Sequence, residues 1–215
     1  MMAATIERRD PALRPLLFAG IAAPLLYVAT VAWGATLFPG YSHLSDPISS
    51  LTQAGRPGAE GLESLFLIYN ILVAAFAIGG LSISLGRPQW RFSYAAILVT
   101  ALVGLLMWLF PQDPIGPAPT DAGIVHIVLA GLASLATMAA IAGGGFASRA
   151  DGSGSMARFS FACLVLVFVS GLATAVAMPA GWPFMGLLER ITIGTFEVWL
   201  LVSATNTYAS TRLSR

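Results

Sequence analysis

Six long apolar segments alternate with short polar connections along the chain. They cover approximately residues 13–37, 62–85, 92–110, 124–147, 159–178 and 187–209. Crossing a bilayer takes about 20 mainly apolar residues, so each segment is long enough for one span. Proline and glycine residues in the connections, such as Pro39, Pro88 and Gly152, are typical helix ends. The pattern predicts an all-α integral membrane bundle of six transmembrane helices.

Composition points the same way. Hydrophobic residues make up 57% of the chain and charged residues 10%, against about 25% charged in soluble domains. The formal net charge of +1 gives no reason to expect a nucleic-acid partner. Cys163 is the single cysteine and lies in an apolar run, so we expect a small buried residue and neither a disulfide nor a cysteine metal site.

The arginines indicate an orientation. All eleven basic residues are arginine, and two of them, Arg56 and Arg190, fall on one side of the predicted bundle. The other nine fall on the side of the termini and even-numbered connections: Arg8, Arg9, Arg14, Arg87, Arg91, Arg149, Arg158, Arg212 and Arg215. Because cytoplasmic loops of membrane proteins are enriched in basic residues, we expect both termini in the cytoplasm and the protein in the inner (plasma) membrane. The expected organisation is a tail at 1–12, a membrane domain at 13–209 and a tail at 210–215.

This orientation places the first, third and fifth connections on the outer side. The first connection gathers polar residues that are isolated elsewhere: Tyr41, Ser42, His43, Ser45, Asp46, Ser49 and Ser50. The third carries Asp113 and Asp121 without a basic residue. A site for chemistry or recognition is therefore expected on the outer face.

Two short motifs carry a resemblance to a known family. Residues 39–51 read Pro-Gly-Tyr-Ser-His-Leu-Ser-Asp-Pro-Ile-Ser-Ser-Leu, and 186–191 read Gly-Leu-Leu-Glu-Arg-Ile at the entry to the last apolar segment. With the loosely comparable run Gly20 to Pro24, they resemble a bacterial six-helix integral membrane family known only as a domain of unknown function. The resemblance implies architecture and membrane location, and no activity.

Glu197 is the strongest candidate for chemistry. It lies about ten residues into the last segment, about 15 Å deep at 1.5 Å per residue. An ionised carboxylate there is costly, and such residues are usually protonated, paired or turned to a cavity. We expect a buried general acid or proton relay, the alternative being a neutral acid that only holds helices together.

Arg190, Gly194 and Glu197 share one face of the last segment at i, i+4 and i+7. This spacing suggests Arg190 as an anchor for an anionic group, unless its side chain only reaches the membrane interface.

His126 and Asp121 are further catalytic candidates, since the spacing allows Asp121 to orient the imidazole. His43 and Asp46 would lie with them at the mouth of the site. The same residues with Asp113 offer a zinc site or an acid/base cluster, but no dense histidine motif supports a metal, so neither metal nor cofactor is expected. A Ser-His-Asp hydrolase using Ser42, Ser45 or Ser49 is another alternative, although a serine beside Asp-Pro is commonly a cap.

Substrate contacts are expected from Tyr41, His43, Arg190, Asn70 and Trp199. Asn70 lies in the second segment, next to Tyr69, at a depth from which it could bond Glu197. Trp33, Trp108 and Trp182 near the outer ends are typical of an interfacial belt. Ala130 with Ser134, and the run Gly143-Gly144-Gly145, predict close helix contacts rather than ligand contacts.

These patterns favour a membrane enzyme that uses acid/base chemistry on a lipid or isoprenoid-like substrate, for example in a cyclisation begun by a proton from Glu197. The competing hypotheses are a small carrier or proton- or ion-coupled transporter, and a non-enzymatic accessory protein of the membrane. A wide pore is disfavoured because the first, third and fifth segments carry few polar residues.

Overall fold

The computed structural model describes residues 11–114 and 119–211, and the regular structure in that part of the chain is helical. The long helices are α1 (Arg14–Leu37), α2 (Glu60–Ile83), α3 (Pro88–Met107), α4 (Asp121–Ala150), α5 (Gly154–Ala180) and α6 (Met185–Ser210), with short 3-10 helices η1 (Pro11–Leu13) and η2 (Ile48–Thr52). They match the six predicted segments, with ends that differ by a few residues. The expected tails at 1–12 and 210–215 fall largely outside the described residues.

Five of the described helices, α1 to α5, are long and apolar enough to cross a membrane. The protein is therefore a multi-pass membrane protein. The sixth helix has a comparable length, but it carries Glu189, Arg190 and Glu197 and is not among these five.

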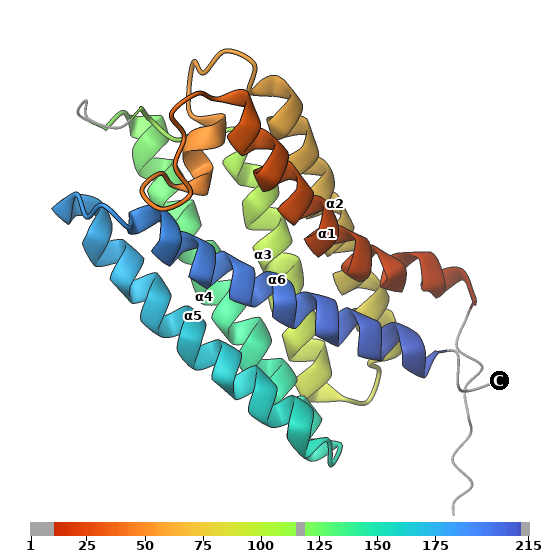
Figure 1. The fold of residues 1–215 in the computed structure, drawn as a ribbon. Coiled ribbons are helices and arrows are strands. Elements are labelled where there is room, and N and C mark those ends of the chain that lie inside the picture. Colours follow the sequence, from red (N-terminus) through yellow and green to blue (C-terminus); the bar gives the residue numbers. More distant parts are fainter. Residues whose placement is uncertain (1–10, 115–118, 212–215) are drawn as a thin grey trace, which may run out of the picture.

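The six helices form a closed ring in which each packs against its neighbours in the chain, and α6 returns to pack against α1 (Figure 1). Consecutive helices run antiparallel (Figure 1). One end of the ring, which we call the arginine end, carries Arg14, Arg87, Arg149 and Arg158 at helix starts and ends. The opposite, capped end carries the long first connection, drawn in orange in Figure 1, which folds over the ring.

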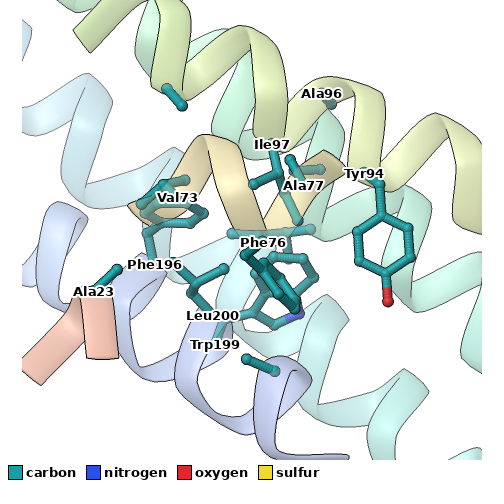
Figure 2. Close-up of a cluster of buried hydrophobic side chains, with 14 of the residues drawn as sticks. Ala23, Val73, Phe76, Ala77, Tyr94, Ala96, Ile97, Phe196, Trp199 and Leu200 are labelled. Atoms are coloured by element: carbon teal, nitrogen blue, oxygen red, sulfur yellow. The ribbon is translucent and has the colours of Figure 1, made fainter. Parts of the chain in front are cut away.

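Large apolar side chains fill the half of the ring nearer the arginine end. Figure 2 shows Val73 and Phe76 of α2, Ile97 of α3, and Phe196, Trp199 and Leu200 of α6 meeting in this core. Phe76, Trp199 and Leu200 are at most 1% exposed. Cys163 is buried in the same cluster, as expected from the sequence.

Small residues on α4 allow this dense packing. A Cβ added to Gly144 would lie 2.6 Å from the Trp199 ring, and one added to Gly143 would lie 3.1 Å from the backbone of Ser93 on α3. Trp199 and Ser93 are each held by a hydrogen bond. Trp199 Nε1 donates to Ser160 Oγ at 3.0 Å, and Ser93 Oγ donates to the Ala140 carbonyl at 2.8 Å. The predicted close contact at the glycine run is confirmed.

This packing predicts that Gly144→Ala destabilises the protein. The added methyl group must displace a buried indole that is hydrogen-bonded in place, and overpacking of this kind costs about 1–3 kcal/mol. Gly131→Ala on the same helix is the matched control, because a Cβ there meets nothing within 4 Å. Unfolding of both variants in detergent should show a lower midpoint for Gly144→Ala alone. Equal midpoints would contradict the tight contact.

Candidate functional site: a roofed cavity at the capped end

A cavity of about 1270 Å³ occupies the half of the ring nearer the capped end. Its walls come from Tyr27 of α1, the first halves of α2, α4 and α6 and the second halves of α3 and α5. Most of the lining is apolar, including Phe66, Met138, Ile193 and Phe196. The bundle is thus packed solid at one end and hollow at the other, a division that helix periodicity alone does not predict.

Glu197 lies in the wall of this cavity and is 3% exposed. Tyr69 Oη donates a hydrogen bond to Glu197 Oε1 at 2.5 Å, and the Tyr27 ring lies 4.9 Å from the Tyr69 ring. The second carboxyl oxygen, Oε2, is buried without a hydrogen-bond partner among the described residues. Buried polar atoms are nearly always paired, so an unpaired carboxyl oxygen beside a cavity marks a place where a ligand or water can bond.

Two more titratable side chains line the cavity. Glu189 Oε2 accepts the Ile48 backbone N–H at 2.6 Å, at the roof. It precedes Glu197 by eight residues on α6, about 12 Å along the helix axis. His126 Nδ1 lies 2.8 Å from the Phe110 carbonyl oxygen. Because a carbonyl only accepts, Nδ1 is the donor, and in the neutral ring Nε2 is left as an acceptor.

The first connection forms the roof of the cavity. We call residues 38–59 the roof loop; Pro47, Ile48, Ser49 and Thr52 from it contribute to the cavity lining. Its apolar underside, Ile48 and Leu51, packs with Val31 of α1 and Leu62 of α2. On its far side, Ser49 Oγ bonds the Gln112 side chain, and the Ala54 N–H donates to the Gln112 carbonyl at 2.8 Å. The loop therefore lies folded onto the helices around it.

Arg190 attaches the roof loop to α6. Its guanidinium donates to Tyr41 Oη, to His43 Nδ1 at 3.1 Å and to the Asp46 carbonyl oxygen at 2.8 Å. The Leu187 N–H adds a bond to the Leu44 carbonyl at 2.9 Å. Gly186 is required here, because any Cβ would collide with the Asp46 backbone.

Tyr41 completes this attachment. Partial burial raises the pKa of its phenol above the ordinary value, against the opposing effect of Arg190. The phenol therefore stays protonated and donates to the Pro47 carbonyl oxygen at 3.2 Å while it accepts from Arg190.

Several expected pairings are wrong. Asp121 is exposed at the first turn of α4, and the carbonyl of Phe110, not Asp121, bonds His126 Nδ1. The Asp46 carboxylate accepts the Ser42 N–H at 2.8 Å and the Ser45 hydroxyl at 3.4 Å, so it holds a turn of the roof loop and does not line the cavity. Within residues 11–114 and 119–211, no three His, Cys, Asp or Glu side chains gather in a metal-binding group, so the considered zinc cluster does not form.

The expected partners of Glu197 also change. Asn70 donates to the Phe66 carbonyl of its own helix at 2.9 Å and packs on Gly104 of α3, while its neighbour Tyr69 reaches Glu197. Trp199 is 1% exposed in the core and does not line the cavity. Arg190 shares the helix with Glu197, but its guanidinium bonds the roof loop and the Gly186 carbonyl of its own helix. Ala130 and Ser134, expected at a helix contact, line the cavity.

The alternative of a Ser-His-Asp hydrolase finds no support in the roof loop. The Ser45 and Ser49 hydroxyls bond Asp46 and Gln112, and the Ser42 hydroxyl accepts backbone N–H groups. His43, the nearest histidine in sequence, accepts from Arg190. These serines therefore shape the loop.

Three site residues had not been singled out from the sequence: Tyr69 as the partner of Glu197, Glu189 as a lining carboxyl, and Gln112 as the link between loops. A signal for Glu189 exists, since Glu189, Thr192, Ile193 and Phe196 follow the i, i+3, i+4, i+7 spacing of one helix face and all line the cavity. No local pattern distinguishes Tyr69 from Asn70, because which of two neighbours faces α6 depends on the rotation of α2.

Fold and site together define a class: a multi-pass α-helical membrane protein with an apolar, roofed cavity beside a buried carboxyl group. The chain belongs to the family described as "Protein of unknown function (DUF998)", whose model matches residues 21–206. This match confirms the family resemblance inferred from the sequence. Neither the curated proteins nor the solved structures include a significant match to the chain.

The attachment of the roof loop predicts a local effect of Arg190→Gln. Removing charged hydrogen bonds to Tyr41, His43 and Asp46 should loosen the loop and cost about 1–3 kcal/mol. Hydrogen exchange of peptides covering residues 41–48 should become faster by tenfold or more.

Arg91→Gln, an exposed change at the arginine end, is the control and should leave this exchange unchanged. Equal exchange of residues 41–48 in the two variants would refute the role of Arg190 as the attachment point.

Proposed function

We propose that this protein is an integral membrane enzyme that takes a lipid or isoprenoid-like substrate into the capped-end cavity and acts on it by acid/base chemistry. The observation that carries the proposal is Glu197: a buried carboxyl with one oxygen bonded to Tyr69 and the other unpaired, in the wall of a large apolar cavity. Ligand cavities in proteins are about 300–1,000 Å³, so this one has room for a long hydrophobic molecule.

A substrate from the bilayer needs a way in, and the space between α4 and α5 supports one. Ile127 and Leu135 of α4 and Phe168 and Leu172 of α5 line the cavity and are 46–61% exposed. A Cβ added to Gly131, between the two α4 residues, would meet no atom within 4 Å. Exposed side chains that line the cavity on two neighbouring helices support a lateral opening between α4 and α5, and the roof loop lies over the capped end.

In the proposed reaction the neutral Glu197 carboxyl donates its proton to a carbon–carbon double bond of the substrate. The apolar surroundings favour the neutral acid, because an ionised carboxylate there would be costly. A second double bond attacks the resulting carbocation and closes a ring. Loss of a proton from a neighbouring carbon to the Glu197 carboxylate gives a product isomeric with the substrate and restores the acid.

The other lining groups have supporting roles in this scheme. Tyr69 orients the Glu197 carboxyl, and the aromatic rings of Tyr27, Phe66 and Phe196 offer π faces to a cation. Glu189 and His126, nearer the roof, would receive the polar end of the substrate. Arg190, Tyr41, His43 and Asp46 act indirectly, by holding the roof in place.

A small carrier coupled to protons is the competing function, favoured by the same buried carboxyl. In that case Glu197 would gain and lose a proton as the cargo moves, with no covalent change in the cargo. The α6 helix, which carries Glu197, would be the sixth span in either case, enclosed between α1 and α5 with its polar residues turned to protein or cavity.

The test of the enzyme uses purified protein in nanodiscs made from the lipids of its expression host. The wild type should convert one lipid species to an isomer, and in D₂O the product should carry one deuterium. Glu197→Gln should lower the rate by about 10²-fold or more, the usual contribution of a general acid, while the substrate still copurifies. Glu60→Gln, an exposed carboxyl on the first turn of α2, is the matched control and should keep full activity.

The outcomes separate the hypotheses. Proton flux into proteoliposomes that Glu197→Gln abolishes, with no altered lipid, would favour the carrier. Neither conversion nor flux, and no bound lipid in the wild type, would reject both and leave an accessory protein.

We also propose that the arginine end faces the cytoplasm, with residues 13–209 as the membrane domain and 1–12 and 210–215 as tails. Two single-cysteine variants test this orientation. In a Cys163→Ala background, one carries Glu60→Cys at the capped end and the other carries Gln89→Cys at the arginine end. A membrane-impermeant maleimide should label Glu60→Cys on intact cells and Gln89→Cys only after lysis. The reverse result would invert the orientation.

A further inference from the structure

A second, smaller cavity of about 540 Å³ lies at the arginine end. It is bounded by the connection between α2 and α3, the hairpin between α4 and α5, and the last turns of α6. Among the described residues it shares no lining residue with the capped-end cavity. Along the helices, the residues of the apolar core shown in Figure 2 come between those that line the capped-end cavity and those that line this one. It is therefore a separate candidate site.

Two buried hydroxyl groups in its wall have no hydrogen-bond partner in the part of the chain that the structure describes. Ser148 of α4 and Ser203 of α6 are 2% and 4% exposed, and neither Oγ has a hydrogen-bond partner among the described residues. Other helical hydroxyls in this protein return a bond to the carbonyl four residues earlier, as Ser134 and Thr207 do. Because buried polar atoms are nearly always paired, these two hydroxyls are candidate partners for a ligand in the cavity whose wall they belong to.

The rim of this cavity is polar and electrically balanced. Arg87 and Asp151, its only charged residues within the described chain, form an ion pair with each other. Trp90 Nε1 donates to Asp151 Oδ2 at 2.7 Å, and the Trp90 ring stacks on Tyr94 at 5.8 Å between centroids. The cavity thus combines a fixed aromatic surface with hydroxyl and amide groups and a formal charge of zero.

We propose that this cavity binds a neutral polyol of hexose size, either a free sugar or the sugar headgroup of a glycolipid. Hydroxyl groups of the ligand both donate and accept, which matches serine hydroxyls such as Ser148 and Ser203. The stacked Trp90–Tyr94 pair, over which Arg87 lies, adds apolar aromatic surface to the lining, against which the C–H groups of a sugar ring can pack. The balanced charge disfavours phosphates and other ions, because a charged ligand would have to compete with the Arg87–Asp151 pair.

The volume agrees with this class. Small-molecule sites are about 300–1,000 Å³, and 540 Å³ accommodates one sugar ring with ordered water. The Ser- and Asn-rich lining also continues to the surface at Ser153 and Asn206, both exposed, so a ligand has a polar way in. The proposal is independent of the function proposed for the capped-end cavity.

The experiment measures binding to the full chain in phosphatidylcholine nanodiscs. Glucose is titrated by calorimetry, with glucose 6-phosphate as the charged comparison, and nanodiscs containing monoglucosyl diacylglycerol are analysed by native mass spectrometry. The double variant Ser148→Ala with Ser203→Ala should weaken binding tenfold or more. Ser134→Ala, whose hydroxyl is already bonded within α4, is the matched control and should bind as the wild type does, as should Glu197→Gln.

Each result has a defined meaning. Glucose binding identifies a free-sugar site, and retention of the glycolipid without glucose binding identifies a headgroup site. Binding of neither probe, or equal binding by the double variant, overturns the proposal and leaves ordered water as the partner of both hydroxyls. The unfolding midpoint of the double variant should stay equal or rise, since it removes unpaired buried groups, so lost binding would not reflect misfolding.

Discussion

The dominant constraint on this structure is the polar side of α6, which the other helices enclose. The buried face of this helix carries Glu197 and Ser203, and its first turns carry Glu189 and Arg190. In a bilayer an unpaired polar group is costly, so such a helix is stable only where other helices enclose it. The ring of α1 to α5 provides that enclosure, and its closure through contacts of α6 with both α1 and α5 follows from the same requirement.

Side-chain size then divides the ring into a solid half and a hollow half. Towards the arginine end, glycines on α4 and α2 receive Trp199 and Tyr94, and helices approach closely. Towards the capped end, small residues such as Gly131 and Ala130 of α4 line the cavity, and the ring encloses space. The empty region is stable because its walls are mostly apolar and because the roof loop is attached to α6 by hydrogen bonds.

The helices and the glycine contacts were predictable because they depend on local patterns: apolar length, proline and glycine positions, and runs of small residues. Membrane depth alone identified Glu197. The partners of Glu197 were not predictable. Whether Tyr69 or Asn70 faces α6 depends on how α2 is rotated about its axis, and a helix that is apolar on all sides has no pattern that fixes this rotation. Arg190 was misjudged for a related reason: its sequence position suggests a ligand anchor, but the roof loop, whose path depends on tertiary contacts, takes up its donors.

The attachment of the roof loop to α6 by Arg190 also bears on which phase would supply the proposed substrate. If the proposed substrate enters between α4 and α5, where apolar residues line the cavity, it arrives by lateral diffusion in two dimensions. Occupancy then depends on the mole fraction of the ligand in the bilayer and not on its bulk concentration. Diluting the membrane with an inert lipid would change saturation, whereas diluting the suspension with buffer would not.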